Sequence, residues 1–182
     1  MRSFLACIVL LSALVMASSQ ASAQNEYEIK ASEWEGKTYV AHRDSVAGSD
    51  ITAFYTQHLP AAYQTIVTSG LSPSGAPSGL YWGLDMETNI FNMAAAVPFS
   101  GDGSPNLQEG YEVIEVAAGP SLVVDYYGPY ELLTEAHAAM GAHMEAEKLD
   151  PAYIVIEEYI TDPTTEPDSS KWHTRIHYLF EE

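Results

Sequence analysis

The nine residues YIVIEEYIT at positions 153–161 are typical of a β-strand, because β-branched and aromatic side chains fill seven of the nine positions. Successive side chains of a strand point to opposite faces of the sheet. One face therefore carries Tyr153, Val155, Glu157 and Tyr159, and the other carries Ile154, Ile156, Glu158 and Ile160. The isoleucine-rich face is expected to pack against helices, which leaves the Glu157 face directed towards a groove.

Glu157 is expected to lie in this groove between two tyrosines. A carboxylate among aromatic rings loses hydration, so it either takes up a proton or attracts a cation. One interpretation is that Glu157 contacts a positively charged ligand, which aromatic faces would also help to hold. The other is that Glu157 pairs with a basic residue of the same fold, for which Arg175 on the neighbouring strand is the candidate. The residues alone leave both interpretations open.

The same order of elements occurs twice along the chain. The first unit is a strand over 37–46, a helix over 51–69 and two strands over 80–87 and 89–99. The second unit is a strand over 111–116 or 121–127, a helix from 128 to 149 and two strands over 153–161 and 171–180. Asp50 is a candidate N-cap of the first helix, and Pro60 is expected to kink or divide that helix.

This order predicts an α+β fold built from a duplicated β-α-β-β repeat with an antiparallel sheet. Such a unit can place its two half-sheets side by side with both long helices on one face. A concave groove would then form where the halves meet, and such junctions are favoured ligand sites. A plain α+β sandwich with a filled core fits the same periodicity.

The strand over 80–87 supplies further candidates for the groove. Its apolar positions, expected in the core, are Leu80, Trp82, Leu84 and Met86. Tyr81 lies on the opposite face, and Gly83 beside it would leave space for a ligand. Trp172 is expected either to line the ligand site or to pack in the core. Met93 and Tyr130 are also candidate ligand contacts, although both residue types commonly pack.

The N-terminus has the pattern of a cleavable secretory signal peptide over residues 1–23. Arg2 precedes an apolar run over 4–17, and the small residues 21–23 lead into a polar segment. The run is shorter than the ~20 residues that cross a bilayer. We therefore expect residues 24–182 to form a single domain, secreted or periplasmic and not inserted in a membrane. Cys7 is the only cysteine, so the expected mature domain has no disulfide.

The charge balance is strongly acidic, with 25 acidic and seven basic residues and a net charge of −18. Such a surface repels nucleic acid and raises the local concentration of cations. No metal and no cofactor are expected, because the histidines lack a chelating spacing and no nucleophile-elbow or dinucleotide motif is present. The six histidines are His42, His58, His137, His143, His173 and His177.

Four groups of residues carry a family resemblance. They are GAPSGLYW at 75–82, AAAVP at 94–98, GPY at 128–130, and EEYITDP at 157–163 followed by EPD at 166–168 and KW at 171–172. Together they resemble the GyrI-like family, which includes the effector-binding domains of AraC-type and related transcription regulators. The resemblance runs from about Tyr55 to Phe180. It implies two repeats around a central cleft that binds hydrophobic, often cationic, organic molecules. Glu157 matches the glutamate of the family's Glu-x-Tyr pattern, and some members resemble hydrolases of strained electrophiles.

Two departures from the family pattern limit what the resemblance implies. Tyr126 stands where many relatives have a histidine, so a role that rests on that imidazole is in doubt. We expect no helix-turn-helix segment before the domain, and an export signal would separate the protein from cytoplasmic DNA. We therefore do not expect a role in transcription.

These observations support two functional hypotheses. The first is a binding protein that sequesters a hydrophobic, cationic or planar small molecule outside the cytoplasm, with Glu157 as its charge partner. The second is a hydrolase, in which Glu157 is a general acid or base towards an electrophile held between Tyr81, Tyr159 and Trp172. A scaffold that receives a peptide would instead need a long, shallow surface.

Overall fold

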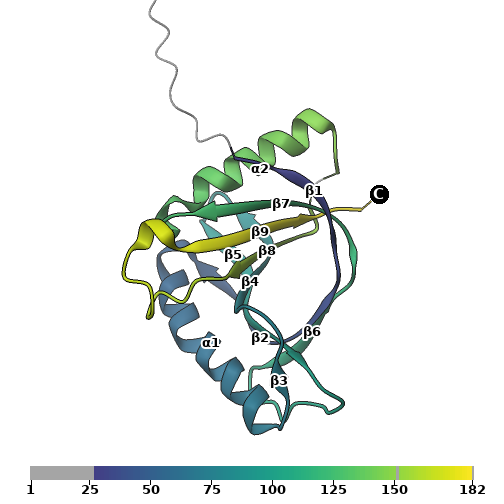
Figure 1. Cartoon of the computed structure of the whole chain (residues 1–182), viewed down its shortest axis with the longest axis vertical. Helices are drawn as coiled ribbons and strands as arrows, with labels where there is room; N and C mark the ends of the chain where they lie inside the picture. The colour runs from purple at the N-terminus through teal and green to yellow at the C-terminus, as the bar shows by residue number, and fades with distance from the viewer. Residues whose placement is uncertain (1–26, 151, 182) are drawn as a thin grey trace, which may run out of the picture.

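A computed structural model describes residues 27–150 and 152–181 (Figure 1). The expected signal peptide lies outside these residues. In the described ranges, no helix combines the length and the apolar character needed to cross a membrane.

The expected helices and strands are present within a few residues of their predicted positions. Both candidate strands at the start of the second unit form, and β1 and β3 are two further strands that the periodicity did not indicate. The strands are β1 (Lys30–Trp34), β2 (Lys37–Ala47), β3 (Ser72–Pro73), β4 (Ser78–Asp85), β5 (Ile90–Ser100), β6 (Glu112–Val116), β7 (Gly119–Tyr127), β8 (Ile154–Tyr159) and β9 (His173–Leu179). The long helices are α1 (Ile51–Thr68) and α2 (Leu133–Glu147), and three short 3₁₀ helices are η1 (Gly48–Asp50), η2 (Tyr130–Leu132) and η3 (Ser169–Lys171).

The sheet confirms the duplicated arrangement. Its order is β1-β7-β9-β8-β4-β5-β2-β6, with β3 beside β5, and all strand pairs are antiparallel. The two repeats are β2-α1-β4-β5 and β7-α2-β8-β9. They meet where β4 pairs with β8, and there Gly79 lies opposite Glu157. The junction between the repeats therefore places Glu157 at the centre of the sheet.

The sheet curls back on itself at a corner. Only two residues separate β1 from β2, and only two separate β6 from β7. Because β1 pairs with β7 while β2 pairs with β6, the two edges of the sheet meet there (Figure 1). Gly36 forms the bend with φ of +81°, and a Cβ at this position would lie 3.0 Å from the Ala118 nitrogen.

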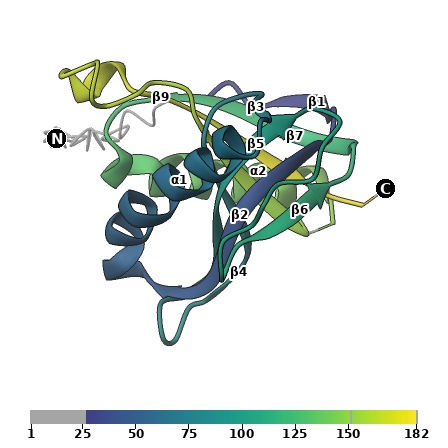
Figure 2. The same ribbon diagram turned by 90° about the horizontal axis from the view of Figure 1, so that it is seen from below.

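Both long helices pack on one face of the sheet, as the sequence predicted. Side chains of directly paired residues point to the same side, so Gly79, Glu157 and Ile176 share a face. On this face α1 packs over β2 and β5, and α2 packs over β7 (Figures 1 and 2). Between the helices, β4 and β8 form the centre of this face.

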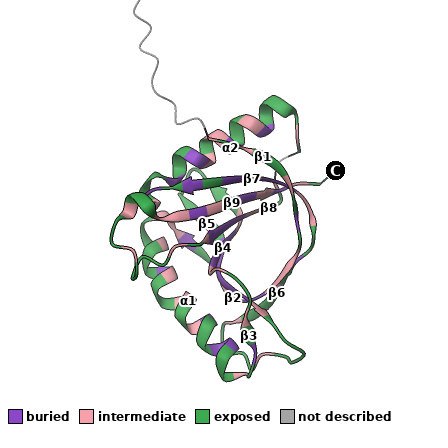
Figure 3. Ribbon diagram, in the orientation of Figure 1, coloured by how far each residue is buried: buried purple, intermediate pink, exposed green. Residues whose placement is uncertain are grey.

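The prediction that the isoleucine-rich face packs against helices is wrong. Ile154 and Ile156 pack with Trp34, Tyr39 and Leu80 inside the curl of the sheet. The helices lie instead on the face that carries Glu157. Both faces of the central strands are therefore covered, one by helices and one by the curled sheet, and these strands are mostly buried (Figure 3). The alternation of side chains along the strand does not show whether helices or the curled sheet cover a given face.

Three local expectations also differ from the structure. The helix α1 continues undivided through Pro60, whose position is exposed, so water can hydrate the carbonyl that lacks a helical partner. Asp50 occupies the N-cap position, but its side chain accepts no capping hydrogen bond from the helix. Leu84, near the end of β4, and Met86, just after it, are 40% and 81% exposed rather than in the core. A register shift after Tyr81 carries the end of this strand into a hairpin that projects from the sheet.

Candidate functional site

Glu157 is a buried carboxylate held by three hydrogen bonds. Its residue is only 5% exposed. The hydroxyls of Tyr159 and Tyr81 donate to Oε2 over 2.7 and 3.2 Å, and Nε2 of His137 lies 2.7 Å from Oε1. These groups come from β8, β4 and α2, so the site exists only when both repeats are assembled.

His137 connects Glu157 to the next strand. Its Nδ1 lies 3.0 Å from the Tyr178 hydroxyl on β9. Because a carboxylate oxygen can only accept, Nε2 carries the hydrogen, and Nδ1 of a neutral ring can accept from Tyr178. A neutral imidazole can satisfy both contacts, and no Lys or Arg among the described residues pairs with Glu157.

Gly79 leaves the space in which the tyrosines meet. Tyr55, on α1, donates to the Tyr81 hydroxyl over 2.7 Å. A Cβ at Gly79 would lie 2.2 Å from the Tyr55 hydroxyl oxygen and 2.9 Å from that of Tyr159. The missing side chain on β4 thus lets phenols from both repeats converge above Glu157.

Further aromatic rings form one end of the site. Tyr130 lies edge-on to Tyr159 with ring centroids 5.5 Å apart, and Trp172 contacts Tyr130 at 4.8 Å. The indole nitrogen of Trp172 donates to the Glu166 carbonyl, which fixes the ring. Thr174, opposite Tyr159 in the register, has a buried hydroxyl without a hydrogen-bond partner among the described residues. Aromatic faces and one unused polar group therefore lie beside the carboxylate.

The tyrosines of the site are neutral donors at ordinary pH. Burial raises the pKa of Tyr81 and Tyr159 well above 10, and the negative charge of Glu157 raises both further. The same two causes raise the pKa of Tyr178 to about 12. The tyrosines therefore supply hydrogen-bond donors to the site and add no negative charge.

The ion pair between Glu157 and Arg175, considered from the sequence, does not form, and both residues have other partners. Arg175 contacts Asp125, with Nε and Oδ1 2.8 Å apart, and lies opposite Glu158 in the register. Glu158 contacts Lys37 and lies 3.2 Å from Nε2 of His177 inside the curl. Burial opposes its ionisation, but the hydrogen bonds and charges of these two partners outweigh burial and bring the pKa of Glu158 to about 2. The side chains of Glu157 and Glu158 therefore lie on opposite faces of the sheet and have separate partners.

The remaining predicted residues lie at different distances from this centre. Met93 is fully buried and packs beneath Tyr81, its partner in the register. Tyr153 precedes β8, is 44% exposed and lies four extended residues, about 13 Å, from Glu157. Tyr126, at the position where relatives have histidine, donates to the Pro129 carbonyl over 2.8 Å.

His137 and Tyr55 contribute to the site but were not among the sequence candidates. Each lies in line with core-facing residues of its helix: residues 133, 140 and 144 in α2, and residues 51, 59 and 62 in α1. Polar side chains among such residues are the signal that could have identified them.

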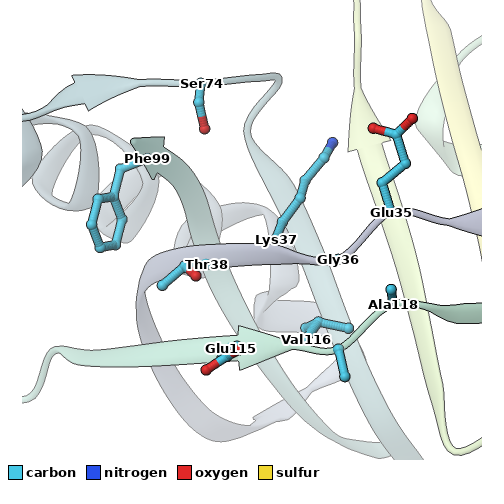
Figure 4. Close-up of a pocket in the computed structure, with 10 residues that line it drawn as sticks. Glu35, Gly36, Lys37, Thr38, Ser74, Phe99, Glu115, Val116 and Ala118 are labelled. Carbon is cyan, nitrogen blue, oxygen red and sulfur yellow. The ribbon is translucent and has the colours of Figure 1, made fainter. Parts of the chain in front are cut away.

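Two cavities lie outside the place where Tyr55, Tyr81 and Tyr159 meet, and none of these three residues lines either of them. One of about 390 Å³ lies at the corner of the curled sheet, between Glu35, Lys37, Ser74 and Glu115 (Figure 4). The other, of about 370 Å³, lies between α2 and the strands β8 and β9. The central cleft expected from the sequence is occupied at Glu157 by phenol rings. Among the described residues, no group of three or more metal-binding side chains is gathered.

Solved structures share this architecture at low sequence identity. The C-terminal domain of EcmrR is 20% identical with a TM-score of 0.69, over 86% of this chain and 99% of that domain. EcmrR in its DNA complex gives 18% identity and a TM-score of 0.75, and the match covers 86% of this chain but only 58% of that one.

Two further matches are a protein solved with a ligand and a protein described as a hydrolase. SAV2435, solved with tetraphenylphosphonium, is 17% identical with a TM-score of 0.60, over 85% of this chain and 94% of that one. A hydrolase from Listeria innocua is 12% identical with a TM-score of 0.58, over 84% and 91% of the two chains. No family model and no curated protein sequence matches. These matches over most of the chain, together with its curled antiparallel sheet and two long helices, show that this chain has the GyrI-like fold.

Proposed function

We propose that this protein binds a small hydrophobic cation between its two repeats and sequesters it outside the cytoplasm. The observation that carries the proposal is Glu157, a 5% exposed carboxylate surrounded by phenols and one histidine, with no Lys or Arg ion pair among the described residues. The ligand's positive charge would lie against Glu157, and its apolar groups against the surrounding rings.

The attraction between the ligand's positive charge and Glu157 is strengthened because the buried carboxylate is poorly hydrated. Two opposite charges 4 Å apart attract by about 1 kcal/mol in water and by about 4 kcal/mol near a protein surface. Each well-placed aromatic face adds roughly 0.5 to 2 kcal/mol for a cation. Tyr130, Tyr159 and Trp172 are the rings available for such contacts. Entry of a ligand requires Tyr81 and Tyr159 to move, because their hydroxyls donate to the carboxylate.

Two independent observations support this ligand class. The chain's net charge of −18 favours the approach of cations over anions. SAV2435, which has the same fold, was solved with tetraphenylphosphonium, a lipophilic cation. Export, which rests on the sequence pattern of residues 1–23, would place the binding outside the cytoplasm. Expression of the full chain in a bacterium and intact-mass measurement of the recovered protein tests it, since a mass that retains residues 1–23 contradicts export.

The adjacent glutamates provide a matched test of binding. Titration calorimetry with tetraphenylphosphonium should show at least a tenfold loss of affinity for Glu157→Gln, because the amide keeps the shape but not the charge. Glu158→Gln removes an equally buried carboxylate from the other face and should bind within twofold of the wild type. Neutral triphenylphosphine oxide should bind Glu157→Gln and wild type alike. Equal cation affinity in all three proteins would refute the proposal.

A hydrolase is the second candidate. The observation in its favour is the 2.7 Å contact between His137 and Glu157, which places two groups able to transfer protons beside the rings of Tyr81 and Tyr159. Incubation of epoxides with a hundredth of an equivalent of protein distinguishes the two functions. Multiple turnovers that disappear in Glu157→Gln would establish hydrolysis, whereas unchanged substrate would leave binding as the function.

A further inference from the structure

An apolar cavity lies on the Glu157 face of the sheet, under the second half of α2. Its volume is about 370 Å³, within the range of small-molecule sites. Its lining is mainly aliphatic, and Glu145 is its one carboxylate. The residues that line it are Gly141, Met144, Glu145, Leu149, Ala152, Val155 and Tyr178.

This cavity continues from the carboxylate along β8. Val155, in its wall, lies two residues from Glu157 on the same face, a separation of about 7 Å. Tyr178, also in the wall, contacts His137, which in turn contacts Glu157. The charged centre and the apolar cavity therefore lie next to each other on this face of the sheet, linked through Val155, Tyr178 and His137.

We propose that this cavity holds the alkyl chain of an amphiphilic cation whose head group lies at Glu157. The inference rests on the proposed function and narrows its ligand class from hydrophobic cations to cations with a flexible tail. Charge and shape both favour this occupant. The acidic carboxylates Glu157 and Glu145 disfavour an anionic lipid, and methionine beside aliphatic side chains accommodates a flexible chain.

Gly141 sets the space available to the tail. A Cβ built at this position meets no heavy atom within 4 Å. Glycine within a helix costs roughly 0.5 to 1 kcal/mol relative to alanine, so a larger residue here would stabilise α2 while occupying the cavity. Gly141→Leu is thus expected to fold and to fill the site. Ala142→Leu, on the exposed side at the next position, adds the same bulk outside it.

A series of n-alkyltrimethylammonium ions with six to twelve carbons, each below its critical micelle concentration, tests the inference by calorimetry. In the wild type and in Ala142→Leu, affinity should rise about threefold to fourfold with each methylene until the cavity is full. In Gly141→Leu the affinity should be nearly independent of chain length. Binding of tetraphenylphosphonium, which has no tail, should stay within about threefold in all three proteins.

The outcomes separate this inference from the proposed function. A wild-type affinity that does not depend on chain length, or a dependence that survives in Gly141→Leu, overturns the tail site even if Glu157→Gln abolishes cation binding. A chain-length dependence that Gly141→Leu removes, with no effect of Glu157→Gln, supports the apolar cavity and refutes the charge partner. Sedimentation equilibrium that shows a wild-type dimer, dissociated by Gly141→Leu, assigns the cavity to a second copy and overturns the proposal.

Discussion

Replacement of Gly79 by alanine tests whether the convergence of tyrosines depends on one missing side chain. The new Cβ would lie 2.2 Å from the Tyr55 hydroxyl oxygen and 2.9 Å from both the Tyr159 hydroxyl oxygen and a ring carbon of Tyr81. The backbone of Gly79 does not have a positive φ, so alanine introduces no backbone strain there. Any effect must therefore come from displacement of the rings by about 1 Å.

The size of the effect follows from the contacts that this displacement breaks. Tyr55 would lose its hydrogen bond to Tyr81, worth about 1 kcal/mol, and Tyr159 its bond to a charged carboxylate, worth roughly 1.5 to 3 kcal/mol. Alanine is less flexible than glycine in the unfolded chain, which stabilises the folded protein by about 0.4 to 1 kcal/mol. We expect the free energy of unfolding to fall by about 2 to 3 kcal/mol, which lowers Tm by roughly 6 to 10 °C.

Urea unfolding followed by tyrosine fluorescence measures this change, and calorimetry with tetraphenylphosphonium measures its effect on binding. Gly83→Ala is the matched control on the same strand, because a Cβ at Gly83 meets nothing within 4 Å. The control should stay within about 0.5 kcal/mol of the wild type, whereas Gly79→Ala should also lose at least tenfold in affinity. If the two variants unfold at the same urea concentration, the steric account of the tyrosine cluster is refuted.

Two pH-dependent predictions concern other parts of the fold. Because the pKa of Glu158 falls from 4.5 to about 2 on folding, its ionisation adds stability that is complete above pH 4.5 and is lost as the pH falls towards 2. In Glu158→Gln we expect the free energy of unfolding, measured in urea, to be about 2 kcal/mol lower at pH 7 and to depend less on pH below 4.5. The same pH dependence in the variant and the wild type would contradict this. His58 stacks on His42 at 3.8 Å, and burial followed by the charge of His42 lowers its pKa below 6.5. Stability should therefore fall as the pH drops below 6.5, and His58→Asn, which can keep a contact to Tyr111, should reduce that slope; the same slope in the variant would refute the assignment.

The fold was predictable because its signals are local. Period-two alternation placed strands at 80–87, 89–99 and 153–161, and each formed within a few residues of its expected bounds. The duplicated order then predicted antiparallel half-sheets with both helices on one face, as observed. Local periodicity did not distinguish a helix from a curled sheet as the cover of Ile154 and Ile156, since either buries an apolar face. Nor did it indicate that the strand beginning at Leu80 leaves the core after Tyr81, because that change is a register shift against β5.

The sequence by itself determined that Glu157 shares a face with Tyr159 and that Glu158 points the other way, because adjacent residues of a strand always diverge. Only the tertiary structure decided their partners. His137 reaches Glu157 from a helix 20 positions earlier in the chain, and Lys37 reaches Glu158 from 121 positions away. Those contacts depend on the register of β8 against β4 and β9, and a slip of one residue would exchange the two carboxylates between the faces. Alternation is a property of each strand, whereas the register is set by the packing of the whole sheet.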